Sequence, residues 1–154
     1  MTDRSPVSPD DPQSPGGPIP AGIWVLNQAR SNLLAPKSVT LWIIRNTQEA
    51  LTWVGVETDS TGNTKVLTWS GRYRGAPQIV VGAGIEARLT CEVVEGIKTE
   101  GEFPGIGRFV EVCRLADGGQ RMVCTGEVAT PEGVKTYLED FDWFGASPHP
   151  AAIR

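Results

Sequence analysis

The chain has 154 residues, with 14 Lys and Arg against 18 Asp and Glu, a formal net charge of −4 at pH 7 and 40% hydrophobic residues. This length and composition predict one folded domain and exclude disorder throughout. An acidic balance without a basic cluster argues against nucleic acids and anionic membranes as partners. The sequence contains neither the roughly 20 apolar residues of a membrane span nor the apolar core of a signal peptide. We therefore expect a cytoplasmic protein.

The first 20 residues hold six of the twelve prolines, interspersed with serine and glycine. Such a composition cannot form a packed core. It predicts a disordered N-terminal arm over residues 1–20, a folded domain over 21–145 and a C-terminal tail over 146–154.

From residue 21 onward, short runs rich in Val, Ile, Thr and Trp are separated by glycine-bearing turns, which is typical of an all-β protein. The pattern predicts one short helical segment over Gln28–Leu34. An antiparallel meander exposes its edges unless the sheet closes, so we expect an up-and-down β-barrel of eight to ten strands around a cavity. The predicted strands are Gly22–Leu26, Ser38–Asn46, Ala50–Thr58, Lys65–Tyr73, Glu86–Val94, Ile97–Phe103, Gly107–Leu115, Arg121–Ala129 and Lys135–Asp142.

The cysteines and the single histidine restrict the chemistry that is open to the chain. Cys91, Cys113 and Cys124 form an odd set without C-x-x-C spacing, so we expect buried small hydrophobic residues rather than a disulfide framework or a zinc site. His149 lies alone between two prolines near the C-terminus. Triads that need a histidine are therefore not expected, and carboxylates, Tyr, Arg and Lys remain as acid and base groups. We expect no metal and no cofactor.

Several short motifs have a familiar order. A Gly-x-Trp opening is followed by a Leu-Asn-x-x-Arg-Ser stretch, a Tyr-x-Gly element and an Asp-Gly turn, at Gly22-Ile23-Trp24, Leu26 to Ser31, Tyr73-Arg74-Gly75 and Asp117-Gly118. Over about residues 21 to 142 the sequence resembles the bacterial lipocalin-like group of the calycin superfamily.

This resemblance implies an up-and-down barrel whose cavity takes an apolar or aromatic small molecule. It implies that Trp24 closes the narrow end of the barrel and that Asn27, Arg30 and Ser31 form its rim or base. Some calycin-like barrels are cofactor-independent enzymes, including phenolic acid decarboxylases and allene oxide cyclases, so a lyase or isomerase is a second expectation.

Aromatic residues on neighbouring predicted strands are the candidate ligand-binding groups. Trp42, Trp53, Trp69 and Phe109 offer flat faces to an aromatic ligand, and Arg88 would bind an anionic group. The alternative is that the tryptophans fill the core or cover the outside of the barrel. In that case they would suit a homo-oligomeric structural module.

Glu111 is the sharpest candidate for acid-base chemistry, because it alternates with Phe109 and Cys113 on one strand face. If that face points inward, the carboxyl group meets the cavity and its pKa is raised. Tyr73 is a second candidate for proton transfer, and Arg72 for stabilising an anion. The alternative is that these charges point to solvent, as most strand charges do.

The segment from Tyr137 to Phe144 mixes aromatic residues with carboxylates at the end of the last predicted strand, where it would line the barrel mouth. Asp140 and Asp142 share a strand face and could act as a pair. Taken together, the sequence favours binding of a small hydrophobic or aromatic molecule in the barrel. A cofactor-free lyase or isomerase and a homo-oligomeric module remain the alternatives.

Overall fold

The computed structural model describes residues 17–146, which form ten antiparallel strands and two single 3₁₀ turns. The all-β prediction is confirmed. The 3₁₀ turns are η1 (Gln28–Arg30) and η2 (Asp117–Gly119). The strands are β1 (Gly22–Leu26), β2 (Lys37–Asn46), β3 (Ala50–Asp59), β4 (Thr64–Arg72), β5 (Gln78–Ile79), β6 (Arg88–Val94), β7 (Gly96–Phe103), β8 (Gly107–Ala116), β9 (Arg121–Thr130) and β10 (Gly133–Gly145).

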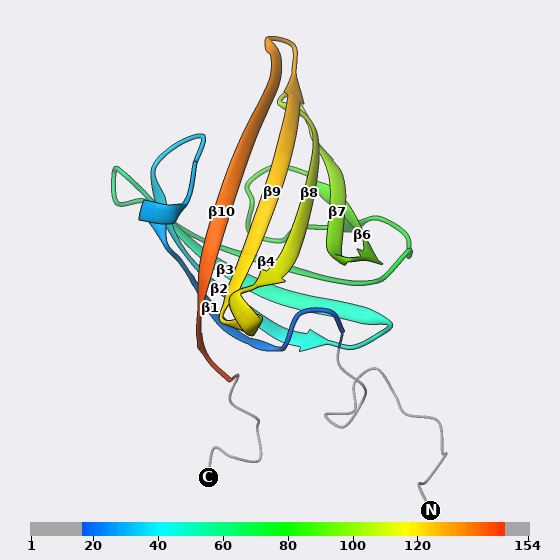
Figure 1. Ribbon diagram of the computed structural model, residues 1–154. Coiled ribbons are helices and arrows are strands. Elements are labelled where there is room, and N and C mark those ends of the chain that lie inside the picture. Colours follow the sequence, from blue (N-terminus) through cyan, green and yellow to red (C-terminus); the bar gives the residue numbers. More distant parts are fainter. Residues whose placement is uncertain (1–16, 147–154) are drawn as a thin grey trace, which may run out of the picture.

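The strands form one sheet in the order β4-β3-β2-β1-β10-β9-β8-β7-β6-β5, and this sheet curls into a nearly closed barrel (Figure 1). Strands that are neighbours in the sheet are also consecutive in the chain, with one exception: β1 pairs with β10 on the side that faces away from β2. The two ends of the sheet, at β4 and β5, meet at the seam of the barrel. Across this seam, Thr68 and Val81 exchange backbone hydrogen bonds of 3.0 and 2.9 Å, and Arg74 N donates to Cys91 O at 2.7 Å. These bonds satisfy part of what would otherwise be two open sheet edges.

The strand boundaries follow the sequence pattern closely. β1 has its predicted bounds, and the other long strands differ mainly at their ends, where β10 runs three residues beyond Asp142 to Gly145. The two-residue strand β5 was not expected, because it is too short to produce a periodic pattern. Of the two forms that the sequence allowed for Gln28–Leu34, one helical turn or a short helix, the structure has the single turn η1.

Alternation along the strands produces the core, in which Trp24, Trp69 and Met122 are fully buried. Trp24 meets Trp143 edge to face, with ring centroids 4.9 Å apart, and this contact joins β1 to β10. A packing role for Trp24 agrees with this position.

The predicted arm over residues 1–20 needs a correction at its end. Ile19 is 1% exposed and belongs to the core. Gly17 N donates to Asn46 O at 2.9 Å, and Asn46 Nδ2 donates to Ile19 O at 2.6 Å. One isoleucine and these two hydrogen bonds fasten residues 17–20 to the barrel, which composition alone did not indicate. Residues 1–16 and 147–154, including His149, lie outside the described residues.

The turn between β3 and β4 illustrates how local sequence fixes the register. Asp59 Oδ1 accepts hydrogen bonds from the backbone N of Thr61 at 2.9 Å and of Asn63 at 3.0 Å. The hydrogen bonds, first that of the Thr61 hydroxyl, lower the pKa of Asp59. Gly62 has a φ of +88°, a conformation that glycine adopts without steric cost. The turn therefore sets Thr58 opposite Thr64.

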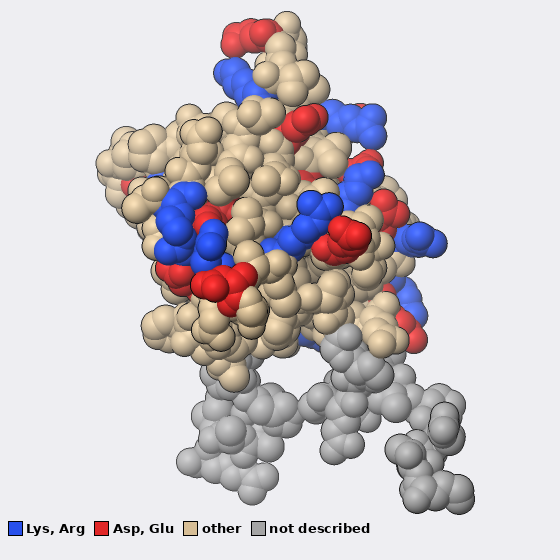
Figure 2. Space-filling model, viewed as in Figure 1, with Lys and Arg blue, Asp and Glu red and all other residues tan. Residues whose placement is uncertain are grey.

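Acidic and basic side chains are interspersed on the face of the molecule in Figure 2, where no large field of one sign is visible. Most of the ion pairs on the described surface, such as Arg88 with Glu86, are exposed. Among residues 17–146 no helix has the length and apolar character needed to cross a bilayer.

Candidate functional site

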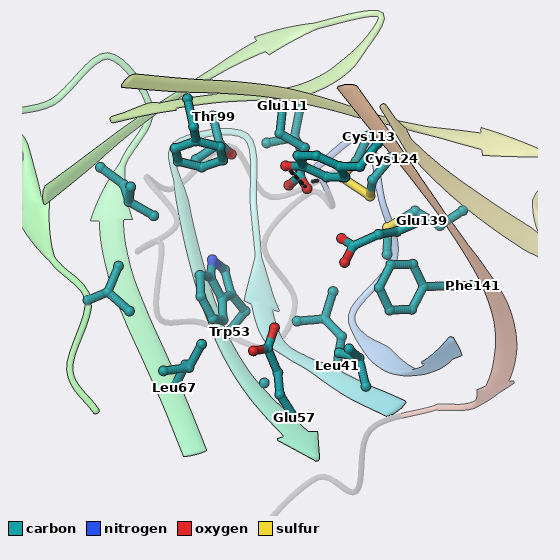
Figure 3. A pocket seen from close by; sticks show the side chains of 18 of the residues that line it. Leu41, Trp53, Glu57, Leu67, Thr99, Glu111, Cys113, Cys124, Glu139 and Phe141 are labelled. Atoms are coloured by element: carbon teal, nitrogen blue, oxygen red, sulfur yellow. Dashed lines mark hydrogen bonds between the residues drawn. A yellow bond between two sulfur atoms is a disulfide. The ribbon is translucent and has the colours of Figure 1, made fainter. Parts of the chain in front are cut away.

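The barrel encloses a cavity of about 440 Å³. Its wall is formed by inward-facing side chains of every long strand from β2 to β10 and by the segment after η1 (Figure 3). Most of these side chains are aliphatic or aromatic. They include Leu41, Ile43, Leu51, Trp53, Leu67, Leu89, Phe103, Phe109, Met122, Val128 and Phe141. An apolar cavity with a few polar groups is the ordinary form of a small-molecule site.

Glu111 on β8 lines this cavity together with Phe109 and Cys113. Of the two directions that the alternation left open for this strand face, the structure therefore shows the inward one. Its carboxylate Oε1 accepts a hydrogen bond of 2.9 Å from the Tyr137 hydroxyl. Its Oε2 faces Cys113 Sγ at 3.6 Å. That sulfur belongs to a disulfide and has no proton to donate, so the carboxylate is only partly satisfied by the wall.

Gly126 on β9 makes this hydrogen bond possible. It lies directly opposite Glu111 on one side and Tyr137 on the other. A Cβ atom at position 126 would lie 2.1 Å from Cζ of Tyr137. The absence of a side chain therefore lets the phenol ring lie across β9 and reach a carboxylate two strands away.

A lysine and two further glutamates complete the polar part of the wall. Lys37, at the start of β2, lies with its Nζ 2.8 Å from Glu139 Oε2 and 3.3 Å from Glu57 Oε1. Glu139 is 12% exposed at its side chain and projects into the cavity from β10 (Figure 3). Since Tyr137 and Glu139 are two residues apart on one strand, they share its inner face. We call Lys37, Glu57, Glu111, Tyr137 and Glu139 the polar cluster.

The polar cluster shifts the proton affinities of its members. Burial, followed by the charge on Glu139, raises the pKa of Glu111 to about 8. Burial and then the charge on Glu111 also raise the pKa of Tyr137. Burial alone would lower the pKa of Lys37, but the charges of Glu139 and Glu57 outweigh it and the pKa is raised. Near neutral pH a protonated Glu111 therefore lies in the same cluster as a charged Lys37.

Cys113 and Cys124 form a disulfide between β8 and β9, with Cα atoms 4.0 Å apart. The expectation of three unpaired cysteines is thus wrong for this pair, because the register places the two residues opposite each other, which spacing along the chain does not reveal. Both sulfurs border the cavity beside Glu111. Cys91 stays free and buried as expected, and burial raises its pKa to about 11.

One group of described donor atoms is compact enough for a metal ion. The donor atoms of Glu111, Cys113 and Cys124 lie within 4.8 Å of one another. Thiolates, not disulfide sulfurs, are the sulfur ligands of metals. With the disulfide formed, the three residues therefore do not fit a metal centre.

Two of the predicted catalytic residues lie away from the cavity, together with the predicted anion-binding arginine. Arg72 is exposed on the outer face of β4 and pairs with Glu49 at 3.0 Å. Arg88 is exposed and pairs with Glu86 at 2.8 Å. Tyr73 follows β4, packs beside the core and donates its hydroxyl to Asn46 Oδ1. Of the three predicted catalytic residues, Glu111 is therefore the one that lines the cavity.

The predicted ligand-binding aromatics divide in a similar way. Trp53 and Phe109 line the cavity, where the Phe109 ring lies 5.1 Å from that of Phe103. Trp69 is 2% exposed in the core beside the cavity, and its Nε1 donates to Gln78 O at 3.0 Å. Trp42 lies on the outer face of β2, because its neighbours Leu41 and Ile43 point inward.

The residues that sequence reasoning missed are chiefly Lys37 and Glu139. Lys37 begins a strand and reads as an ordinary end charge. Glu139 alternates with Tyr137 and Phe141 on an apolar face, and this was the available signal. Of the Tyr137–Phe144 segment, these three alternate residues line the cavity, and a place at the barrel mouth stays a prediction.

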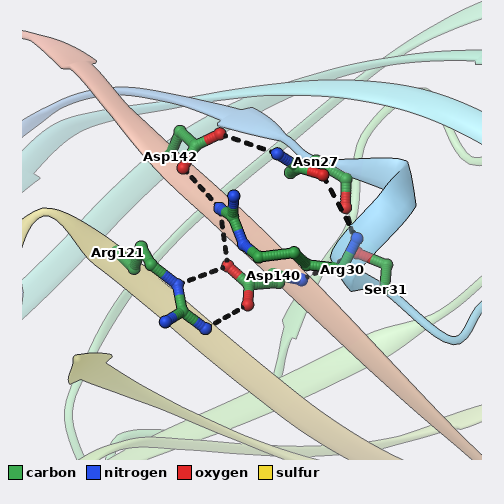
Figure 4. A network of polar contacts seen from close by, with 6 residues as sticks. All are labelled: Asn27, Arg30, Ser31, Arg121, Asp140 and Asp142. Carbon is green, nitrogen blue, oxygen red and sulfur yellow. Dashed lines mark hydrogen bonds and ion pairs between the residues drawn. The ribbon is translucent and has the colours of Figure 1, made fainter. Parts of the chain in front are cut away.

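A second polar network lies on the outer face of β10, under the turn η1 (Figure 4). Asp140 is 3% exposed at its side chain and accepts hydrogen bonds from Arg121 Nε at 3.1 Å and Arg30 Nη2 at 3.2 Å. Arg30 also pairs with Asp142. The two arginines hold the pKa of Asp140 below its usual value despite burial.

The same network fastens the turn η1 to the barrel. Asn27 Nδ2 donates to Asp142 Oδ2 at 3.2 Å. Ser31 Oγ donates to Asn27 O at 2.7 Å and accepts from Asp140 N at 3.0 Å. Asn27, Arg30 and Ser31 thus bind the first loop to the last strand. They outline a structural clamp rather than a site, since each aspartate is already paired with arginine.

Comparison with known proteins adds no further assignment, because no family model, no curated protein and no solved structure matches the chain.

Proposed function

We propose that the protein binds a small hydrophobic or aromatic molecule inside its barrel, in the manner of a lipocalin-like protein. The observation that supports this proposal is the cavity of about 440 Å³ with its predominantly apolar wall. A ligand that buries on the order of 200 Å² of apolar surface gains about 5 kcal/mol from desolvation. Trp53, Phe103 and Phe109 add aromatic faces against which a planar ligand can pack.

The test uses the neutral fluorescent probe N-phenyl-1-naphthylamine. We expect saturable binding of one probe per chain, with energy transfer from tryptophan, since Trp53 borders the cavity. Gly55→Leu fills the cavity, because a Cβ at position 55 makes only an ordinary contact of 3.6 Å with Trp53. The matched control is Val56→Leu, because Val56 is 39% exposed on the other face of β3.

We expect folded Gly55→Leu protein to lose the probe and Val56→Leu protein to retain it. Equal binding by the two variants would place the probe outside the cavity and contradict the proposal. Concentration-dependent quenching without probe binding would instead favour association of chains through an outer face.

A second candidate is a cofactor-free lyase or isomerase that uses the same cavity. The observation in its favour is Glu111, an acid with a pKa of about 8 held by Tyr137 in an apolar site. Groups with such a pKa transfer protons efficiently near neutral pH. The test follows deuterium uptake from D₂O at the acidic C–H group of 1-tetralone. Acceleration by the native protein but not by Glu111→Gln would support this activity, and no acceleration would count against it.

A further inference from the structure

The charges in the cavity wall are unbalanced. Among residues 17–146, Lys37 is the one basic residue that lines the cavity, whereas Glu57, Glu111 and Glu139 are acidic. Lys37 is already shared between Glu57 and Glu139, at 3.3 and 2.8 Å. An anionic ligand would add negative charge to a site that already has an excess of it, and Coulomb repulsion is strong where water is displaced.

Lys37 forms its ion pairs with Glu57 and Glu139, whereas it acts on the Glu111 carboxyl group only from a longer distance. The groups that surround it are Tyr137 and Glu139 from β10, Lys37 from β2, Thr99 from β7 and the disulfide of Cys113 and Cys124. Cys91 from β6 lies behind Thr99, at 3.3 Å between Sγ and Oγ1. Tyr137 donates a hydrogen bond to Glu111, and the Glu139 carboxyl group is a second side-chain hydrogen-bond partner of Glu111. When Glu111 is ionised, its contact with Glu139 becomes a repulsion between like charges, and Lys37 is already shared by Glu57 and Glu139. A further donor with positive charge would relieve this repulsion.

We infer that the ligand is an organic ammonium ion, with an apolar body in the barrel and a protonated amine placed between Glu111 and Glu139. This inference rests on the proposed function and specifies its ligand class. The apolar body occupies the aliphatic and aromatic part of the cavity. The N–H groups donate to the carboxylate oxygens, and charge-assisted hydrogen bonds of this kind are stronger than neutral ones.

Binding of the ammonium ion displaces a proton. The free protein holds Glu111 as a carboxylic acid near pH 7. When R–NH₃⁺ enters, Glu111 loses H⁺ to solvent and the carboxylate pairs with the unchanged ammonium ion. One proton is thus released for each ligand bound, and affinity rises with pH up to the pKa of Glu111. No bond other than the carboxyl O–H is broken.

The experiment compares three ligands with the same ten carbons: 4-phenylbutylamine, 4-phenylbutanol and 4-phenylbutyrate. Titration calorimetry at pH 7 in two buffers of different ionisation enthalpy gives both the Kd and the number of protons released. We expect the amine to bind at least tenfold more tightly than the alcohol and to release close to one proton. The alcohol should release none, and the carboxylate should bind most weakly.

Two variants make the same substitution, glutamate to glutamine, on the inner and on the outer face of the barrel wall. Glu111→Gln should reduce the ratio of amine to alcohol affinity at least fivefold and abolish proton release. Glu127→Gln, on the outer face of β9, should change neither quantity. Circular dichroism checks that both variants fold.

The outcomes separate the inference from the proposed function. If the alcohol or the carboxylate binds as tightly as the amine, or if Glu111→Gln keeps the amine preference, the ammonium inference is wrong while binding in the cavity stands. If N-phenyl-1-naphthylamine and all three phenylbutyl ligands fail to bind, the proposed function fails as well.

Discussion

The Tyr137 hydroxyl lies 2.9 Å from Glu111 Oε1, although the two residues belong to strands β10 and β8, which are not neighbours in the sheet. Strand β9 lies between them and presents Gly126 at the point of crossing. A hydrogen bond across an intervening strand is thus built into the cavity wall by the choice of one residue.

Gly126→Ala should separate this pair. The added methyl group would overlap the Tyr137 ring, with the Cβ 2.1 Å from Cζ. We expect a loss of about 1–3 kcal/mol in the free energy of unfolding, as for other overpacked positions, measured by urea denaturation. Gly145→Ala is the control, since a Cβ there has open space. A Gly126→Ala protein as stable as the native chain would contradict the crossing geometry.

Glu111 should make stability depend on pH. Its pKa is raised from 4.5 to about 8 in the folded chain, so the folded state binds the proton more tightly than the unfolded state does. Its stabilising effect is therefore complete below about pH 4.5 and is lost as the pH rises through about 8. At 1.36 kcal/mol per pKa unit, the loss is on the order of 5 kcal/mol.

The measurement is the free energy of unfolding between pH 5 and 8.5 for the native chain, Glu111→Gln and Glu127→Gln. Native protein and Glu127→Gln should lose stability with rising pH, and Glu111→Gln should show a much flatter profile. Parallel profiles for all three proteins would mean that Glu111 does not carry the dependence.

The disulfide predicts a thiol count and a stability difference. Unfolded, unreduced protein should react with one equivalent of a thiol reagent, at Cys91, and reduced protein with three. Closing a loop of 11 residues contributes up to about 3 kcal/mol by restricting the unfolded chain. A reductant should therefore lower the midpoint of denaturation. The double variant Cys113→Ala with Cys124→Ala is the control, because its midpoint should not respond to reductant.

Asp140 and Asp142 should differ in their importance for stability. Asp140 is 3% exposed and bound by two arginines, whereas Asp142 is 47% exposed. Asp140→Asn should cost about 2 kcal/mol, because hydrogen bonds to charged groups are lost where water cannot replace them. Asp142→Asn should cost less than about 1 kcal/mol, as is usual for surface pairs. Equal losses of stability for the two variants in thermal denaturation would show that the burial of Asp140 does not strengthen its ion pairs.

The sequence predicted the strands and the shared face of Glu111, Phe109 and Cys113, because both depend on local alternation. Whether that face points inward was left open by the alternation. Glu111 follows Phe109 by two residues, and one buried residue determines the face of the other. Arg72 shows what local alternation does not reveal. It shares a face with Ser70 and Thr68 in the pattern, and nothing local indicated that Trp69 is the inward member of that strand.

The partners of Glu111 could not be predicted, because they depend on register. Lys37 on β2 reaches Glu139 on β10 although β1 lies between these two strands in the sheet. Cys113 meets Cys124 only because η2 sets the register of β8 and β9. Such contacts join residues whose sequence separation carries no signal of proximity.

The position of β1 between β2 and β10 has a consequence for synthesis of the chain. On the ribosome, β1 to β4 emerge early and can pair with one another, but β1 remains a bare edge until β10 has been translated. Trp24 then lacks Trp143, which meets it in the finished barrel. Closure of the barrel on β1 therefore waits for β10, which comes last of the ten strands in chain order.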